Sequence, residues 1–214
     1  MKEYKSYEGP LIGMLLAMVS GSIDSYTFLD RGGVFAGLQT GNNILMGISL
    51  SQLQFGKALQ YVISILFFAL GILIVKLIQQ KIEQESIRKR VIIIYEITIL
   101  LISGILAKVL PDMLIVGLLA IAASAQLQEF KMLKGNSFNP LMMTGNVSKT
   151  MNNLYATLKN KDNKSKGILI DTLMIMFSFI LGSLLMGAVN NFANDFSILA
   201  SVLPLVIVLF SIKE

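Results

Sequence analysis

Long runs of apolar residues, separated by short polar segments, dominate this 214-residue chain. A helix that crosses a bilayer needs about 20 predominantly apolar residues. Six runs meet this length, at residues 10–30, 56–80, 90–109, 111–130, 167–190 and 195–212. The pattern predicts an all-α integral membrane protein with six transmembrane helices, folded as a single transmembrane domain over residues 1–214.

Two further segments, residues 32–51 and 134–158, are only moderately apolar. Each can be a weak spanning helix or a re-entrant loop followed by a half helix. Because cytoplasmic loops carry an excess of Lys and Arg, the basic residues discriminate between six and eight spans. Six spans place 15 of the 18 basic residues inside and 3 outside, whereas eight spans place 10 inside and 8 outside. We therefore expect six spans in the cell (inner) membrane, with both termini in the cytoplasm.

The two ambiguous segments share a motif. Residues 31–42 and 134–146 both read basic-Gly-x-x-Phe-x-x-Leu, then one or two residues, then Thr-Gly-Asn. Each motif follows one apolar run and precedes two more, which divides the chain into repeat one (1–109) and repeat two (110–214). Three spans are an odd number, so the second copy enters the membrane in the opposite orientation. Such a 3+3 inverted-topology repeat is typical of transporters, whose sites lie near the midplane where broken helices end.

The Thr-Gly-Asn motifs are expected to start two re-entrant half helices. Thr40 and Thr144 suit the N-cap position, and a helix over residues 40–51 rises about 18 Å, a little over half of the hydrocarbon core. The unpaired N–H groups and the positive dipole end of each half helix favour an anion or a polar oxygen. The expected substrate-binding residues are Thr40, Gly41, Asn42, Asn43, Thr144, Gly145 and Asn146. Alternatively, the motif only caps a helix and its Asn pairs with a neighbouring helix.

Several polar residues fall inside or at the ends of the apolar runs. Asp24 lies in the second half of the first run, where a carboxylate is costly unless it is paired, protonated or hydrated. It is a candidate proton-coupling group, with a structural hydrogen bond as the equal alternative. Tyr26, Gln126 and Gln128 are candidates for lining the solute path, although Tyr26 is equally suited to anchor the interface. Glu96 and Asp171 are interpreted as interfacial groups within reach of Lys or Arg.

The composition limits the chemistry that the protein can perform. The chain has no Cys and no His, which removes the usual nucleophile, the usual metal ligands and the usual general base. We therefore expect no enzyme activity, no metal site and no cofactor. The net charge of +5 comes from basic residues in short loops between apolar runs, so anionic lipid rather than nucleic acid is the expected partner.

At these same motifs the chain resembles the YoaK-like family of bacterial multi-spanning membrane proteins of unknown function. The matching stretches are residues 21–25 (Gly-Ser-Ile-Asp-Ser), 32–35 (Gly-Gly-Val-Phe) and the two Thr-Gly-Asn motifs, together with Gln126 and Gln128. Ser22 stands where that family usually has an aromatic residue. The resemblance implies a multi-spanning inner-membrane protein and supplies no substrate.

The leading functional hypothesis is a small secondary transporter or facilitator for a small anionic or polar solute. The solute would bind near the midplane between the two half-helix N-termini, with Asp24 as the candidate proton-coupling group. A passive channel and a membrane scaffold or accessory subunit that transports nothing remain as alternatives. The expected partners are membrane lipid and a small-molecule or ion substrate, and the sequence leaves a homo-oligomer open.

Overall fold

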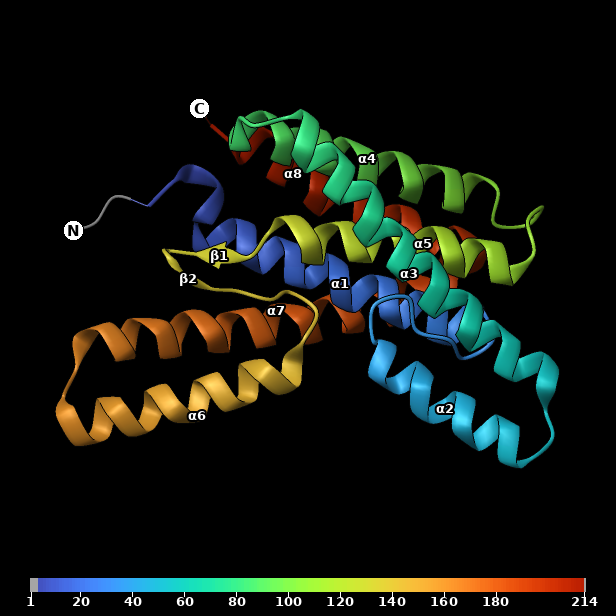
Figure 1. Ribbon diagram of the computed structural model, residues 1–214, viewed down its shortest axis with the longest axis horizontal. Coiled ribbons are helices and arrows are strands. Elements are labelled where there is room, and N and C mark those ends of the chain that lie inside the picture. Colours follow the sequence, from blue (N-terminus) through green and yellow to red (C-terminus); the bar gives the residue numbers. More distant parts are fainter. Residues whose placement is uncertain (1–3, 214) are drawn as a thin grey trace.

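The computed structural model describes residues 4–213, and most of them are helical (Figure 1). A 3₁₀ turn, η1, precedes α1, and a second 3₁₀ segment, η2, joins α7 to α8. The one sheet of the described residues is a hairpin in which β1 pairs antiparallel with β2. The elements are η1 (Ser6–Glu8), α1 (Pro10–Asp30), α2 (Gln39–Ser51), α3 (Phe55–Lys81), α4 (Glu85–Ile105), α5 (Asp112–Glu129), β1 (Met132–Leu133), β2 (Asn136–Ser137), α6 (Met143–Asn160), α7 (Asn163–Ala193), η2 (Asn194–Ser201) and α8 (Val202–Ser211).

The helices α1 and α5 form the centre of the molecule. Their apolar stretches are 67% and 72% buried, against 22% for α3. α7 packs along α1 and α3 packs along α5, while α4 and α8 contact each other as well as the central pair. Small residues permit the close approach: a Cβ at Gly182 of α7 would overlap the carbonyl of Met18 on α1, and a Cβ at Gly71 of α3 would lie 2.9 Å from Ile121 Cα on α5.

The contacts between helices fall into matched pairs. α1 with α7 corresponds to α5 with α3, α2 with α3 corresponds to α6 with α7, and α4 with α5 corresponds to α8 with α1. In each case, exchanging α1 with α5, α2 with α6, α3 with α7 and α4 with α8 converts one contact of the pair into the other. The same exchange relates Gly71 on α3 to Gly182 on α7, because each glycine lies where its helix contacts the backbone of a central helix.

The two short helices α2 and α6 begin near the middle of the molecule and run to opposite ends (Figure 1). α2 leads into α3 and α6 leads into α7, and each pair forms a hairpin. The sequence predicted half helices from residues 40 and 144, and the structure begins each one residue earlier. An irregular segment precedes each of them, residues 31–38 before α2 and the hairpin with its following loop before α6.

The all-α class predicted from the sequence is confirmed. Within the described residues, four helical stretches are long and apolar enough to cross a membrane: α1, α3, α5 and the continuous stretch Asn163–Ser211, which comprises α7, η2 and α8. α4 is more polar because three basic residues occupy its first two turns and Glu96 follows. Large apolar side chains are exposed along the outer helices, including Leu66, Phe177 and Phe192. A surface of this kind is typical of a membrane protein.

Candidate functional site

The loop before α2 is closed by the side chain of Asn42, which is fully buried. Its amide oxygen accepts a hydrogen bond from the Phe35 backbone N–H at 2.9 Å, and its amide nitrogen donates to the Phe35 carbonyl at 2.7 Å. The Ser64 hydroxyl of α3 donates to the same carbonyl at 2.8 Å. Asn42 is therefore committed to holding the loop, which supports the structural alternative for this residue.

The loop before α6 repeats this arrangement. The Asn146 amide nitrogen donates to the Asn139 carbonyl at 3.1 Å, again across seven residues. In both loops the backbone N–H groups two and three residues further along the chain are capped, by different groups. The Asp24 carboxylate of α1 accepts from the N–H groups of Gly37 at 2.6 Å and Leu38 at 3.4 Å. In the second loop the Asn139 side chain accepts from Leu141 and Met142, both at 3.0 Å.

Gly37 and Leu141 stand at equivalent positions, three residues before the Thr of each Thr-Gly-Asn motif. The absence of an acid in the second copy thus has a structural reason, because Asn139 supplies from within the loop the acceptor that Asp24 supplies from α1. Asp24 therefore makes the structural hydrogen bonds that were one of its two expected roles.

The prediction that Thr40 and Thr144 are N-caps is wrong. The N-cap positions are Leu38 and Met142, neither makes a side-chain cap, and each Thr is the second residue of its helix. Both Thr side chains are exposed. The physical reason is that Asp24 and Asn139 already provide the acceptors for the turn that enters each helix, so no hydroxyl is needed there.

The starts of α2 and α6 keep free backbone donors. No described residue accepts a hydrogen bond from the N–H groups of Thr40 and Gly41 on α2, or of Thr144 and Gly145 on α6. The Asn43 side chain is exposed and donates only to the carbonyl of Gln39 in its own helix. Free N–H groups at a helix start attract electronegative oxygen atoms.

The two loops touch. A Cβ placed on Gly37 would lie 2.9 Å from Leu141 Cδ2 and 3.2 Å from Asp24 Oδ2. The absence of a side chain at Gly37 thus leaves room for Leu141 of the second loop and for the Asp24 carboxylate beside the first loop.

A hollow of about 250 Å³ opens beside the first loop, between α1 and α7. Its polar lining comes from Asp24, Ser25 and Ser183, and its apolar lining is mainly aromatic: Phe28, Phe35 and Phe179. Phe28 and Phe35 stack with ring centroids 4.9 Å apart. Both hydrogen bonds of Asp24 use Oδ1, and Oδ2 has no partner among residues 4–213.

The structure does not bring the other candidate residues to this hollow. Tyr26 is fully buried beside Arg31, whose Nη2 donates to the Tyr26 hydroxyl at 2.6 Å. Gln126 lies in the core, where its amide oxygen accepts from Ser20 Oγ at 2.5 Å. Gln128 lines a separate pocket of about 200 Å³ at the end of the molecule that holds both termini.

Two ion clusters that the sequence did not single out close the ends of the central helices. After α1, Arg31 donates to Asp112 at 2.9 Å and to Asp195 at 2.7 Å. At the end of α5, Glu129 accepts from Arg88 at 2.9 Å and from Lys89 at 3.2 Å. Exchanging α1 with α5 relates the two clusters to each other. The residue at the end of the central helix is basic in the first cluster, Arg31, and acidic in the second, Glu129. A basic residue directly after one central run and an acid at the end of the other were the available signals.

Asp171 has the basic partner that was expected for an interfacial group, whereas Glu96 does not. Asp171 is paired with Lys134 at 2.8 Å. Glu96 is completely buried on α4, and neither of its carboxyl oxygens has a hydrogen-bond partner. Glu96 faces the packed core of the helices instead of the interface, because the packing of α4 against α5 puts it beside Gln126.

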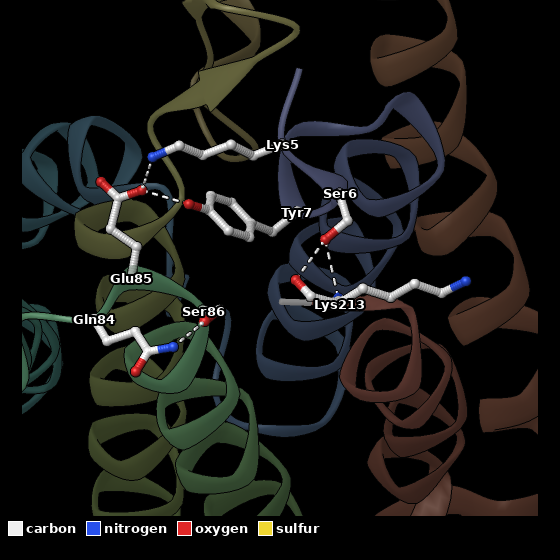
Figure 2. Close-up of a pocket in the computed structure, with 7 residues that line it drawn as sticks. All are labelled: Lys5, Ser6, Tyr7, Gln84, Glu85, Ser86 and Lys213. Carbon is white, nitrogen blue, oxygen red and sulfur yellow. Dashed lines mark hydrogen bonds and ion pairs between the residues drawn. The ribbon is translucent and has the colours of Figure 1, made fainter. Parts of the chain in front are cut away.

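The chain ends meet over a further pocket of about 320 Å³ (Figure 2). Lys5 donates to Glu85 at 2.6 Å, Tyr7 donates to the same carboxylate, and these two bonds hold the pKa of Glu85 at about 2. Ser6 is hydrogen-bonded to Lys213 at 2.9 Å. These contacts fix the N-terminal segment to the start of α4 and to the C-terminal end, and they are remote from the hollow beside Asp24.

Among curated proteins and solved structures, no match was found. A family model described as a protein of unknown function (DUF1275) matches residues 12–211. That match covers all of α1 except its first two residues, every helix from α2 to α8, both loops and the hollow. The chain therefore belongs to the DUF1275 family, which includes the YoaK-like proteins.

Proposed function

We propose that this protein is a small secondary transporter or facilitator for a small anionic or polar solute. In this proposal it has six transmembrane helices, formed by α1, α3, α4, α5, α7 and the η2–α8 segment. α2 and α6 are re-entrant half helices, and the two halves form a 3+3 inverted repeat. The matched helix contacts and the opposite directions of α2 and α6 support the repeat.

The distribution of basic residues supports the orientation. The end of the molecule that holds both termini also holds the α3–α4 and α6–α7 connections and the β-hairpin (Figure 1). All described Lys and Arg residues lie toward that end except Arg31, Lys57 and Lys108. The positive-inside rule supports an orientation in which this end is cytoplasmic, and the proposal is a cell-membrane protein with both termini inside.

The observation that carries the proposal is the contact between the two loops at Gly37 and Leu141, next to a hollow into which Asp24 Oδ2 is free to bond. The free backbone donors of α2 and α6 belong to the residues three and four positions after Gly37 and after Leu141. An ionised Asp24 already supplies negative charge at the first loop, so an anion is favoured there only when Asp24 carries a proton. The geometry thus favours joint binding of a proton and an anionic solute, with Asp24 as the coupling group.

Uptake into liposomes tests the proposal. The purified protein is reconstituted, and a panel of small inorganic and organic anions is supplied with and without an inward proton gradient. We expect gradient-driven uptake of at least one anion, and loss of the gradient dependence in Asp24→Asn, which keeps an acceptor for the Gly37 and Leu38 amides. Ser51→Ala, at the far end of α2, is the matched control. Absence of uptake across the whole panel contradicts the proposal.

The same assay separates the two alternatives. A passive channel gives uptake that is independent of the gradient and unchanged in Asp24→Asn. A scaffold gives no uptake, and its Thr40→Val and Thr144→Val variants should lose stability. The exposed Thr hydroxyls have no partner in the described part of the chain, so we expect both variants to keep their stability and to transport less.

A further inference from the structure

Glu96 is the most isolated acidic group of the described chain. Its side chain is completely buried, and neither carboxyl oxygen reaches a hydrogen-bond donor. The six ion pairs of the described residues do not include it. An ionised carboxylate in such a place lacks both hydration and a countercharge, and a buried group in that situation becomes neutral.

One polar neighbour faces it. The Gln126 amide of α5 lies beside the Glu96 carboxyl, and the amide nitrogen has no hydrogen-bond partner among the described residues. The amide oxygen is occupied on its other side by Ser20 Oγ of α1, at 2.5 Å. Three helices thus contribute one chain of polar groups, which runs from Ser20 through Gln126 to Glu96.

No other titratable side chain competes for this place. α4 packs against α5, α8, η2 and, less extensively, α3. The titratable groups of these elements are Asp112 and Glu129 on α5, Asp195 on η2, and Lys57, Tyr61, Lys76 and Lys81 on α3, while α8 has none. Asp112 and Asp195 are paired with Arg31, and Glu129 with Arg88 and Lys89. On α4 itself, Glu85 is paired with Lys5, Arg90 donates to the Ile212 carbonyl, and Tyr95 is the residue next to Glu96 in the chain.

The chemistry of the neighbours favours a proton over a metal cation. A sodium or calcium ion requires several oxygen ligands. Here Gln126 presents its NH₂ group to the carboxyl, because its oxygen is held by Ser20. Glu96 does not line any of the five best-defined pockets of the described residues. A proton needs neither extra oxygens nor extra volume.

We propose that Glu96 is a proton-binding site, distinct from Asp24, which holds its proton in the resting packing of α4 against α5. The proton passes to water when the two helices separate and the carboxyl is hydrated. This inference deepens the proposed function, since it gives the transporter a second protonatable group. The occupancy of Glu96 is nevertheless measured without any transport, so it can fail or hold independently of the uptake assay.

Infrared difference spectroscopy on the reconstituted full-length protein is the test. At neutral pH we expect a carbonyl-stretch band of a protonated carboxyl group that is absent from Glu96→Gln and present in Asp24→Asn. Gln126→Leu should shift that band to higher frequency, because it removes the one polar neighbour of the carboxyl. Gln128→Leu, the matched control two residues away, should leave it in place.

Stability gives a second readout. Glu96→Gln resembles the protonated side chain, so its melting temperature should match that of the wild type at acidic pH. As the pH rises, the unfolded wild-type chain ionises Glu96 while the native protein keeps its proton, and the wild type should fall below the variant. The proposal is overturned if wild type and Glu96→Gln have the same carboxyl bands at neutral pH, or if their difference in melting temperature is independent of pH.

Discussion

Substitution of Gly182 by Ala tests the helix packing at a single methyl group. A Cβ at this position would overlap the Met18 carbonyl oxygen and lie 2.7 Å from its carbonyl carbon. The obstacle is the backbone of α1, so no rotamer change relieves the contact, and α7 must move away from the central helix. Overpacking of this kind costs about 1–3 kcal/mol. The repeat predicts the same outcome for Gly71→Ala, whose Cβ would lie 2.9 Å from Ile121 Cα on α5.

Gly187 provides the matched control on the same helix. Nothing lies within 4 Å of a Cβ at this position, so Gly187→Ala gains helix propensity without a clash and should stabilise by about 0.5–1 kcal/mol. Thermal unfolding in one detergent measures all three variants against the wild type. For a chain of this size, a loss of 2 kcal/mol corresponds to a melting temperature about 4–8 °C lower. A Gly182→Ala protein as stable as Gly187→Ala would refute the close packing of α7 on α1.

Three further substitutions follow from single contacts. Asn42→Ala leaves the Phe35 N–H unpaired and should lower the free energy of unfolding by about 1–3 kcal/mol. The control Asn43→Ala, at an exposed side chain, should change it by no more than about 0.5 kcal/mol. Equal effects of the two substitutions would contradict the role of Asn42 in closing the loop. Glu129→Gln leaves Arg88 and Lys89 without a countercharge and should cost about 3–5 kcal/mol by thermal unfolding, and a neutral result would disprove the coupling of these groups. Asp162 caps α7 through the N–H groups of Lys164 and Ser165 and the Ser165 hydroxyl, which lowers its pKa below the ordinary 3.8. Ionised Asp162 therefore stabilises the protein above pH 3.8, and this stabilisation is lost as the pH falls through the lowered pKa. Asp162→Asn should flatten this part of the curve of melting temperature against pH, and an unchanged curve would contradict the cap.

The positions of the long helices could be predicted from the sequence, because hydropathy and length alone define an apolar helix. The starts of the two short helices α2 and α6 were also predictable to within one residue, since the repeated Thr-Gly-Asn motif marks both. Contacts between distant segments were not predictable. The choice of Leu38 and Met142 as N-caps depends on acceptors at Asp24 and Asn139, and the first of these comes from a different helix.

The role of Glu96 shows the same limit. Its distance along the chain from Arg88, Lys89 and Arg90 suggests an interfacial group, whereas the rotation of α4 turns it into the core toward Gln126. Rotation about a helix axis is set by packing against α5 and α8, and α4 has polar residues on several faces. Charge clusters at the ends of α1 and α5 were equally hidden, because their members are 40 to 164 residues apart in the chain.

Sidedness of single cysteines tests the central claim of opposed re-entrant half helices. The protein has no native Cys, so Gln52→Cys, Gln84→Cys, Asn160→Cys and Lys213→Cys can be labelled one at a time with a membrane-impermeant thiol reagent. The proposed topology predicts that Gln84, Asn160 and Lys213 are labelled from the cytoplasmic side and Gln52 from the opposite side. Labelling of Gln52 on the same side as Asn160 and Lys213, with Gln84 on the opposite side, would instead show that α2 and α6 cross the membrane completely.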